Sequence, residues 1–163
     1  MSTPRRITYQ YAKDPDTVAA LLHDPEFLRH RAEANGESNI DIKVEPTPDG
    51  MRVVIARDKE VDLPAFAKKM FTPQNRITED TRWRRENGQW VADYQVNVAG
   101  IPGEVRGRSK LVATPSGGCS YESAFEVTAR VPLVGAKLEV IVADKLEQTF
   151  RNNAERNAER LRS

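Results

Sequence analysis

The sequence predicts an α+β protein: a curved, seven-stranded antiparallel sheet, two short helices after the first strand, and a long C-terminal helix over the concave face. Three observations predict this class. Six consecutive segments with β-type patterning are joined by short turns, helical periodicity lies mostly outside that run, and VPLVGAKLEVIVADKLEQTF near the end has an apolar helical stripe. Segregation of strands from helices is typical of α+β proteins.

The length and composition indicate one soluble globular domain over residues 1–163. A chain of 163 residues is long enough to bury one sizeable core and too short for two ordinary domains. The 25 basic and 24 acidic residues are mixed along the chain and give a net charge of +1, so no strong field attracts DNA or RNA. We therefore expect no nucleic-acid partner.

The sequence also limits the expected location and cofactors. The N-terminus has no apolar signal region, and charges interrupt the apolar run near the C-terminus, so we expect a cytoplasmic protein with no integral membrane association. The single cysteine, Cys119, excludes an intrachain disulfide. His23 and His30 lack an acid or cysteine cluster at metal spacing, so we expect no metal and no cofactor.

The first strand and the two short helices are predicted in the N-terminal part of the chain. Residues 5–11 alternate between apolar and polar and are rich in β-formers, which indicates a strand. Asp14 is a typical N-cap before a proline, and a second helix starts at Pro25 and ends at an Asn-Gly pair that includes Gly36.

A hairpin and a short helix are predicted next. Residues 40–44 and 51–55 alternate on either side of the turn sequence PTPDG, which indicates two antiparallel strands. The segment LPAFAKKMF, residues 63–71, then predicts a short helix.

The centre of the chain predicts a strand register. Asn-Gly at 87–88 is typical of a two-residue hairpin, which places Thr81 opposite Tyr94 and Trp83 opposite Ala92. The resulting inner face is mostly apolar, and the other face carries opposed charges, as expected for a sheet with one buried side.

Two further turns complete the predicted sheet. The sequence GIPG makes the next turn, and we expect it to set Ser109 opposite Tyr94 and Gly107 opposite Val96. The sequence TPSGG makes the last turn before a strand at 119–129.

The last helix is expected to cover the concave face. Its apolar residues recur every four positions, which places them on one side of the helix. We expect the helix stripe Leu138, Val142, Leu146 and Phe150 to face the inner row Trp83, Tyr94, Val96 and Phe125.

This order of elements resembles the START-like helix-grip superfamily, which includes the birch pollen allergen, polyketide cyclases and lipid-transfer domains. The runs VPLVGAKLEVIVADKL and DPEFLRHRAEA are similar to those of a bacterial branch labelled as a domain of unknown function. The resemblance covers almost the whole chain. It implies a cavity between sheet and last helix that holds a lipid-like or aromatic molecule. The superfamily uses one cavity for several functions, and this branch has no catalytic motif that can be matched residue by residue.

The residues predict a polar band inside an apolar shell. Thr81, Tyr94 and Ser109 form a row, which Ser123 extends if the last turn keeps its phase, and such placed polar groups are typical of ligand pockets. Alternatively, the hydroxyls are merely tolerated in the sheet and the aromatics are plain core. The candidate ligand-binding residues are Thr81, Trp83, Tyr94, Val96, Ser109, Tyr121, Ser123, Phe125, Leu138, Val142, Leu146 and Phe150.

Glu79 is the one acidic side chain expected on the inner face of its strand. A buried carboxylate without a partner has a raised pKa and is a candidate general acid or base. The alternative is that Glu79, near a strand end, reaches solvent or forms a structural ion pair with a basic residue such as Lys68 or Lys145. His23, beside Asp24, is expected to be a surface histidine.

Three functions follow from these expectations. The first is binding, carrying or sensing a hydrophobic or amphipathic small molecule without covalent chemistry. The second is a cyclase-like or aromatase-like enzyme in which Glu79 and Tyr94 act as acid-base groups; otherwise no catalytic residue is indicated. The third is a protein-interaction or chaperone-assisting role, which predicts a collapsed cavity and an exposed apolar patch. The sequence identifies no protein partner.

Overall fold

The chain begins with an edge strand and two capped helices. The computed structural model describes residues 2–69 and 75–163. Strand β1 (Thr3–Tyr11) is followed by α1 (Pro15–Leu22) and α2 (Pro25–Ala34). The side chains of Asp14 and Asp24 accept hydrogen bonds from backbone N–H groups in the first turns of α1 and α2, which stabilises both helix starts.

The remaining elements follow the predicted order. The helix predicted at residues 63–71 is present as four residues, and its last two positions, Met70 and Phe71, lie outside the described residues. The elements are β2 (Ser38–Thr47), β3 (Gly50–Lys59), α3 (Ala65–Lys68), β4 (Asn75–Glu86), β5 (Gln89–Val98), β6 (Gly103–Ala113), β7 (Cys119–Ala129) and α4 (Gly135–Arg162).

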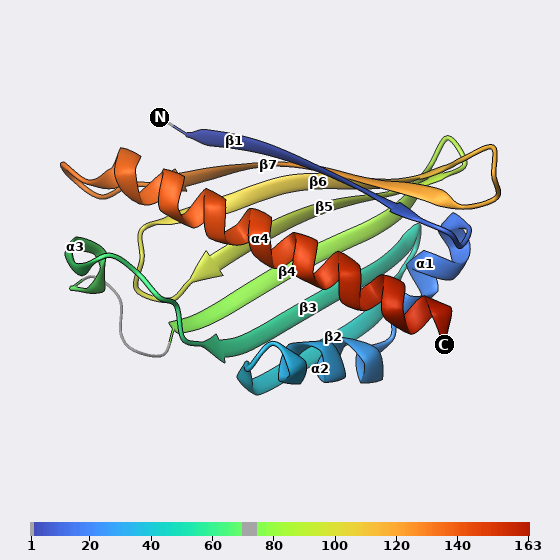
Figure 1. Cartoon of the computed structure of the whole chain (residues 1–163), viewed down its shortest axis with the longest axis horizontal. Helices are drawn as coiled ribbons and strands as arrows, with labels where there is room; N and C mark the ends of the chain where they lie inside the picture. The colour runs from blue at the N-terminus through green and yellow to red at the C-terminus, as the bar shows by residue number, and fades with distance from the viewer. Residues whose placement is uncertain (1, 70–74) are drawn as a thin grey trace.

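The seven strands form one antiparallel sheet with the order β1-β7-β6-β5-β4-β3-β2. Strands β2 to β7 pair with their neighbours in sequence, and β1 pairs with β7 and forms the edge of the sheet opposite β2. Figure 1 shows the sheet curving around α4, which lies along its concave face, while α1 and α2 lie toward the C-terminal end of α4. The predicted fold class is confirmed.

The predicted register is right for one hairpin and wrong for the next. Thr81 lies opposite Tyr94, as the Asn-Gly turn predicts. Between β5 and β6, however, Tyr94 lies opposite Gly107 and Ala92 lies opposite Ser109, so the predicted pairing is displaced by two residues. Because a shift of two preserves the side-chain alternation, every residue stays on its predicted face.

The chemistry of the β5–β6 turn explains this displacement. The N–H of Ile101 donates to the carbonyl of Val98, at 3.1 Å, so the turn is centred on Ala99 and Gly100. Gly100 has a φ of +83°, as the third residue of a type II turn requires. The prediction placed Pro102 at that position, where the ring of proline is unfavourable in the common turns.

The stripe on α4 contacts the sheet over part of its length. Phe150 packs edge-on against Tyr94 and Phe125, with ring centroids 5.9 and 5.4 Å apart, as expected. Leu138 instead packs with Leu63 and Ala67, beside α3.

Trp83 also lies away from the predicted contact with the stripe. It belongs to a core cluster with Val18 and Phe27 of the two short helices and with Ala154 near the end of α4. Because α1 and α2 cover this end of the sheet, Trp83 packs in the core beneath those helices and not against the middle of α4.

The expectation that His23 is a surface residue is wrong. Its ring packs edge-on against Trp83 and Trp90, with centroids 5.5 and 5.4 Å apart. Its Nε2 atom is buried and has no hydrogen-bond partner among the described residues. The residue is the C-cap of α1, and the helix end directs the imidazole onto the sheet.

We expect the burial of His23 to make folding sensitive to acid. Burial lowers the pKa of His23 from 6.5 to about 4. Between these values the unfolded chain binds the proton more readily, so stability is complete above pH 6.5 and falls as the pH drops towards 4. We expect a loss of about 1–2 kcal/mol, because the partial exposure of the ring reduces the full effect.

Urea unfolding at pH 7 and pH 4.5 measures this loss. His23→Phe should remove most of the loss of stability that the burial of His23 causes at the lower pH. His30→Phe, at an exposed position of α2, should show the same loss as the wild type. An unchanged pH dependence in His23→Phe would show that other groups cause it.

Candidate ligand cavity

Two spaces of different chemistry lie between the concave face and α4. The smaller, about 90 Å³, lies towards α1 and α2, and we call it the polar cavity. The larger, about 330 Å³, lies towards the start of α4, and we call it the aliphatic cavity. The walls of the aliphatic cavity include Val96, Val98, Val105, Val127, Val142 and Leu146.

The aliphatic cavity explains an irregularity on α4. Val142 and Leu146 face the sheet and are nevertheless only half-buried, whereas Leu138 and Ala143 are fully buried. The helix therefore lies close to its neighbours at Leu138 and leaves a space beneath Val142 and Leu146. None of the described residues that line this space is aromatic.

The polar cavity is bordered by a buried network of hydroxyl groups. The Tyr94 hydroxyl lies 2.7 Å from Ser123 Oγ, and Ser109 Oγ donates to Ser123 Oγ at 3.1 Å. The Tyr121 hydroxyl lies 3.1 Å from Ser109 Oγ. Burial raises the pKa of both tyrosine hydroxyls above the usual value, so they remain protonated. Three members of the predicted polar band, Tyr94, Ser109 and Ser123, are thus connected, and Ser109 lies opposite Ser123. Tyr121 joins this network, whereas Thr81 lines the cavity without a hydrogen bond to it.

Gly107 makes room for this network. A Cβ atom at this position would lie 2.2 Å from Cζ of Tyr94 and 2.4 Å from its hydroxyl oxygen. The Tyr94 ring therefore crosses over the backbone of β6 to reach Ser123 on β7. The observed β5–β6 register has a structural role, because it places Gly107 directly beneath Tyr94.

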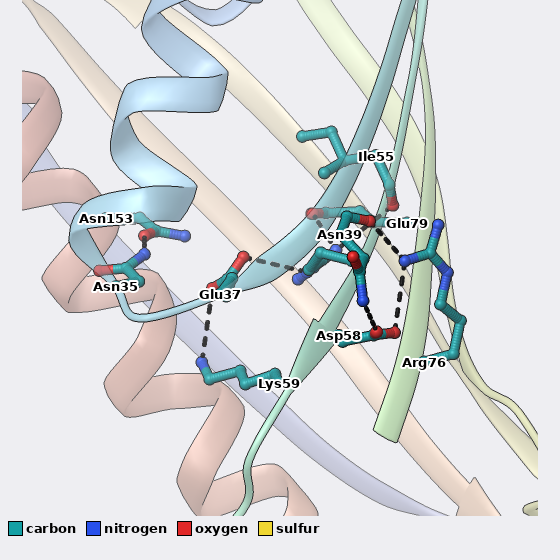
Figure 2. Close-up of polar contacts among 10 residues, drawn as sticks. Asn35, Glu37, Asn39, Ile55, Asp58, Lys59, Arg76, Glu79 and Asn153 are labelled. Carbon is teal, nitrogen blue, oxygen red and sulfur yellow. Dashed lines mark hydrogen bonds and ion pairs between the residues drawn. The ribbon is translucent and has the colours of Figure 1, made fainter. Parts of the chain in front are cut away.

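Glu79 is part of a buried ion-pair cluster. Its Oε2 atom lies 3.4 Å from Nη1 of Arg57, so the ion pair offered as the alternative is present, with Arg57 as the partner in place of Lys68 or Lys145. Arg57 Nε lies 3.3 Å from Glu37 Oε1, and Lys59 Nζ lies 3.7 Å from Glu37 Oε2. Figure 2 shows Glu37 facing Lys59 at the end of α2, and Glu79 beside Ile55 on the neighbouring strands.

Sequence reasoning missed Arg57 and Lys59, although a signal was present. The alternation of Val53 and Ile55 on the inner face continues through residues 57 and 59, so both basic side chains must begin on that face. They lie close to Glu37, whose burial had no signal in the local pattern.

The predicted ligand-binding residues fall into three groups. Those that line the polar cavity are Thr81, Trp83, Tyr94, Ser109, Tyr121 and Phe150. Those that line the aliphatic cavity are Val96, Val142 and Leu146, and those that line neither are Ser123, Phe125 and Leu138. Tyr94 and Phe150, which pack against each other, both line the polar cavity.

Across residues 2–69 and 75–163, no group of three or more His, Cys, Asp or Glu side chains could hold a metal ion. In the same part of the chain, no helix is both long and apolar enough to cross a membrane.

The architecture is the helix-grip fold of START-like proteins, as the resemblance implied. A START superfamily protein from Mycobacterium smegmatis is similar over 97% of this chain and 98% of its own, with a TM-score of 0.63 and 15% identity. The Zhui aromatase/cyclase from Streptomyces sp. R1128 is similar over 98% and 93%, with a TM-score of 0.68 and 12% identity. Norcoclaurine synthase from Thalictrum flavum, solved with dopamine and hydroxybenzaldehyde, is similar over 99% and 87%, with a TM-score of 0.59 and 11% identity.

The family is defined by sequence. Residues 6–161 match the model of the family described as "Protein of unknown function (DUF2505)", and the chain belongs to that family. A comparison with curated protein sequences gave no match.

Proposed function

We propose that the protein binds a hydrophobic or amphipathic small molecule in the aliphatic cavity, as a carrier or sensor and without covalent chemistry. The observation that supports this most is the space of about 330 Å³ beneath Val142 and Leu146. Ligand pockets are typically about 300–1,000 Å³, mostly apolar, with a few placed polar groups. The names of the structural neighbours, which include a START protein and a cyclase, support a small-molecule cavity in this fold.

A pair of tryptophan substitutions on α4 tests the proposal. Val142→Trp should fill the cavity from the helix side, whereas Val140→Trp, two residues away on the exposed side, should not. With decanol as the probe, we expect calorimetry to show binding to the wild type and to Val140→Trp, and at least a tenfold weaker affinity for Val142→Trp. Equal affinity of both variants would contradict the proposal, as would a wild type that binds neither decanol nor its carboxylate analogue, decanoate.

The cyclase-like alternative has less support. Glu79 is paired with Arg57, and the Tyr94 hydroxyl is in hydrogen-bond contact with Ser123. Both line the polar cavity, whose volume of about 90 Å³ corresponds to a few water molecules at about 30 Å³ each. A space of this size suits ordered water better than a reactive chain.

The protein-interaction alternative also has less support. It predicts a collapsed cavity, whereas the aliphatic cavity is open. Among the described residues, the exposed large hydrophobic side chains are Phe66, Leu133 and Val140. Single exposed hydrophobic residues are normal on protein surfaces and do not by themselves make a docking patch.

A further inference from the structure

The polar groups that line the aliphatic cavity include a buried donor without a partner, Asn75, beside a buried arginine, Arg57. The two residues are only 3% and 8% exposed. Asn75 Nδ2 forms no hydrogen bond with any described residue, whereas Arg57 Nε lies 3.3 Å from Glu37 Oε1 in an ion pair. Buried donors without partners are rare in folded proteins, and each requires an explanation such as an absent ligand or water.

The sheet register brings these donors together. Lys59 lies directly opposite Asn75 on the β3–β4 pair, and Arg57 is two residues from Lys59 on the same face. Lys145 of α4 lines the same cavity from the helix side, and no ion pair joins it to another described residue. Four donor side chains from three elements therefore surround one cavity.

The acidic groups nearby compensate only part of this positive charge. Glu37 and Glu79 balance the charges of Arg57 and Lys59, which leaves the ammonium of Lys145 as one uncompensated charge.

Three further acidic residues line the cavity. Glu104 lies 2.7 Å from Nη2 of Arg130, and Glu60 and Asp62 are exposed. The one uncompensated positive charge, on Lys145, thus favours a ligand with a single negative charge.

We propose that the ligand is an aliphatic monocarboxylate. Its carboxylate accepts hydrogen bonds from Asn75 Nδ2 and the ammonium of Lys145, because an ionised carboxylate is an acceptor with about four lone-pair sites. Its chain lies along Val96 and Val142, since the described walls offer aliphatic contacts and no aromatic ring for stacking. This inference rests on the proposed function, which requires only an apolar ligand.

A comparison of decanoate with decanol tests the head-group preference. The two probes share the alkyl chain and differ in the polar end. We expect calorimetry to show that the wild type binds decanoate at least tenfold more tightly than decanol, as expected for hydrogen bonds to a charged group. Decyl phosphate, with a larger negative charge, should bind less tightly than decanoate.

Substitutions then assign the preference to residues. Lys145→Met should lose most of the preference for decanoate over decanol, and Asn75→Leu should lose part of it. Lys137→Met, at an exposed position of the same helix that does not line the cavity, should behave as the wild type. Circular dichroism checks that each variant is folded.

The outcomes separate the two proposals. If decanol and decanoate bind equally, or if decyl phosphate binds most tightly, the monocarboxylate inference is wrong and the proposed binding function stands. If neither decanol nor decanoate binds the wild type, both proposals fail. If Lys145→Met and Lys137→Met retain the same preference, the assigned head-group site is wrong.

Discussion

Arg57→Leu should lower the free energy of unfolding by about 3–5 kcal/mol, the typical cost of removing one partner from a buried ion pair. The side chains of Arg57 and Glu37 are 10% and 5% exposed, and that of Glu79 is 20% exposed. Removal of the guanidinium leaves two carboxylates close together in a poorly solvated place. Urea denaturation at pH 7 measures the effect.

A matched control and a rescue sharpen this prediction. Arg82→Leu removes an arginine from an exposed position of the neighbouring strand and should change stability by no more than about 0.5 kcal/mol. The triple variant Glu37→Leu, Arg57→Leu, Glu79→Leu should recover much of the loss, because apolar replacements of a whole buried ion cluster are often tolerated. If Arg57→Leu costs no more than Arg82→Leu, the cluster is not an energetically important part of the fold.

Gly107→Ala should destabilise the protein by about 2–3 kcal/mol, because the new methyl group would lie within 2.2 Å of Tyr94 Cζ. The ring must move, and its contact with Ser123 is then lost. In an ordinary strand position the same change is favourable, since glycine has the larger conformational entropy in the unfolded chain. Thermal or urea unfolding gives the sign directly.

A double-mutant cycle connects this cost to the tyrosine. In a Tyr94→Leu background the shorter side chain leaves space above β6, and Gly107→Ala should then cost less than about 1 kcal/mol. Equal costs in both backgrounds would show that the strain comes from the backbone of β6 and not from the ring.

The fold could be predicted because local signals and the overall pattern agree. The Asn87-Gly88 turn defines the β4–β5 register, and the alternation on each strand defines the buried face. The GIPG turn was ambiguous, because its glycines and proline allow more than one centre. The resulting error of two residues preserved the face but concealed the contact of Gly107 with Tyr94.

The site could be predicted only in part, because cavities depend on how elements pack. The apolar stripe of α4 identified Val142 and Leu146 as cavity residues, but their spacing does not indicate where the helix separates from the sheet. The partner of Glu79, Arg57, lies on a different strand. The sequence pattern within one strand does not show which residues of the next strand lie beside it, so this ion pair is visible only in the paired strands β3 and β4.

The most direct test of the account is a nuclear Overhauser measurement on the decanol complex, with methyl-labelled valine and leucine. We expect contacts between the alkyl chain and the methyl groups of Val96, Val105 and Val142, which surround the aliphatic cavity. Contacts restricted to Leu133 and Val140, which are exposed on the surface, would contradict the claim that the ligand lies between the sheet and α4.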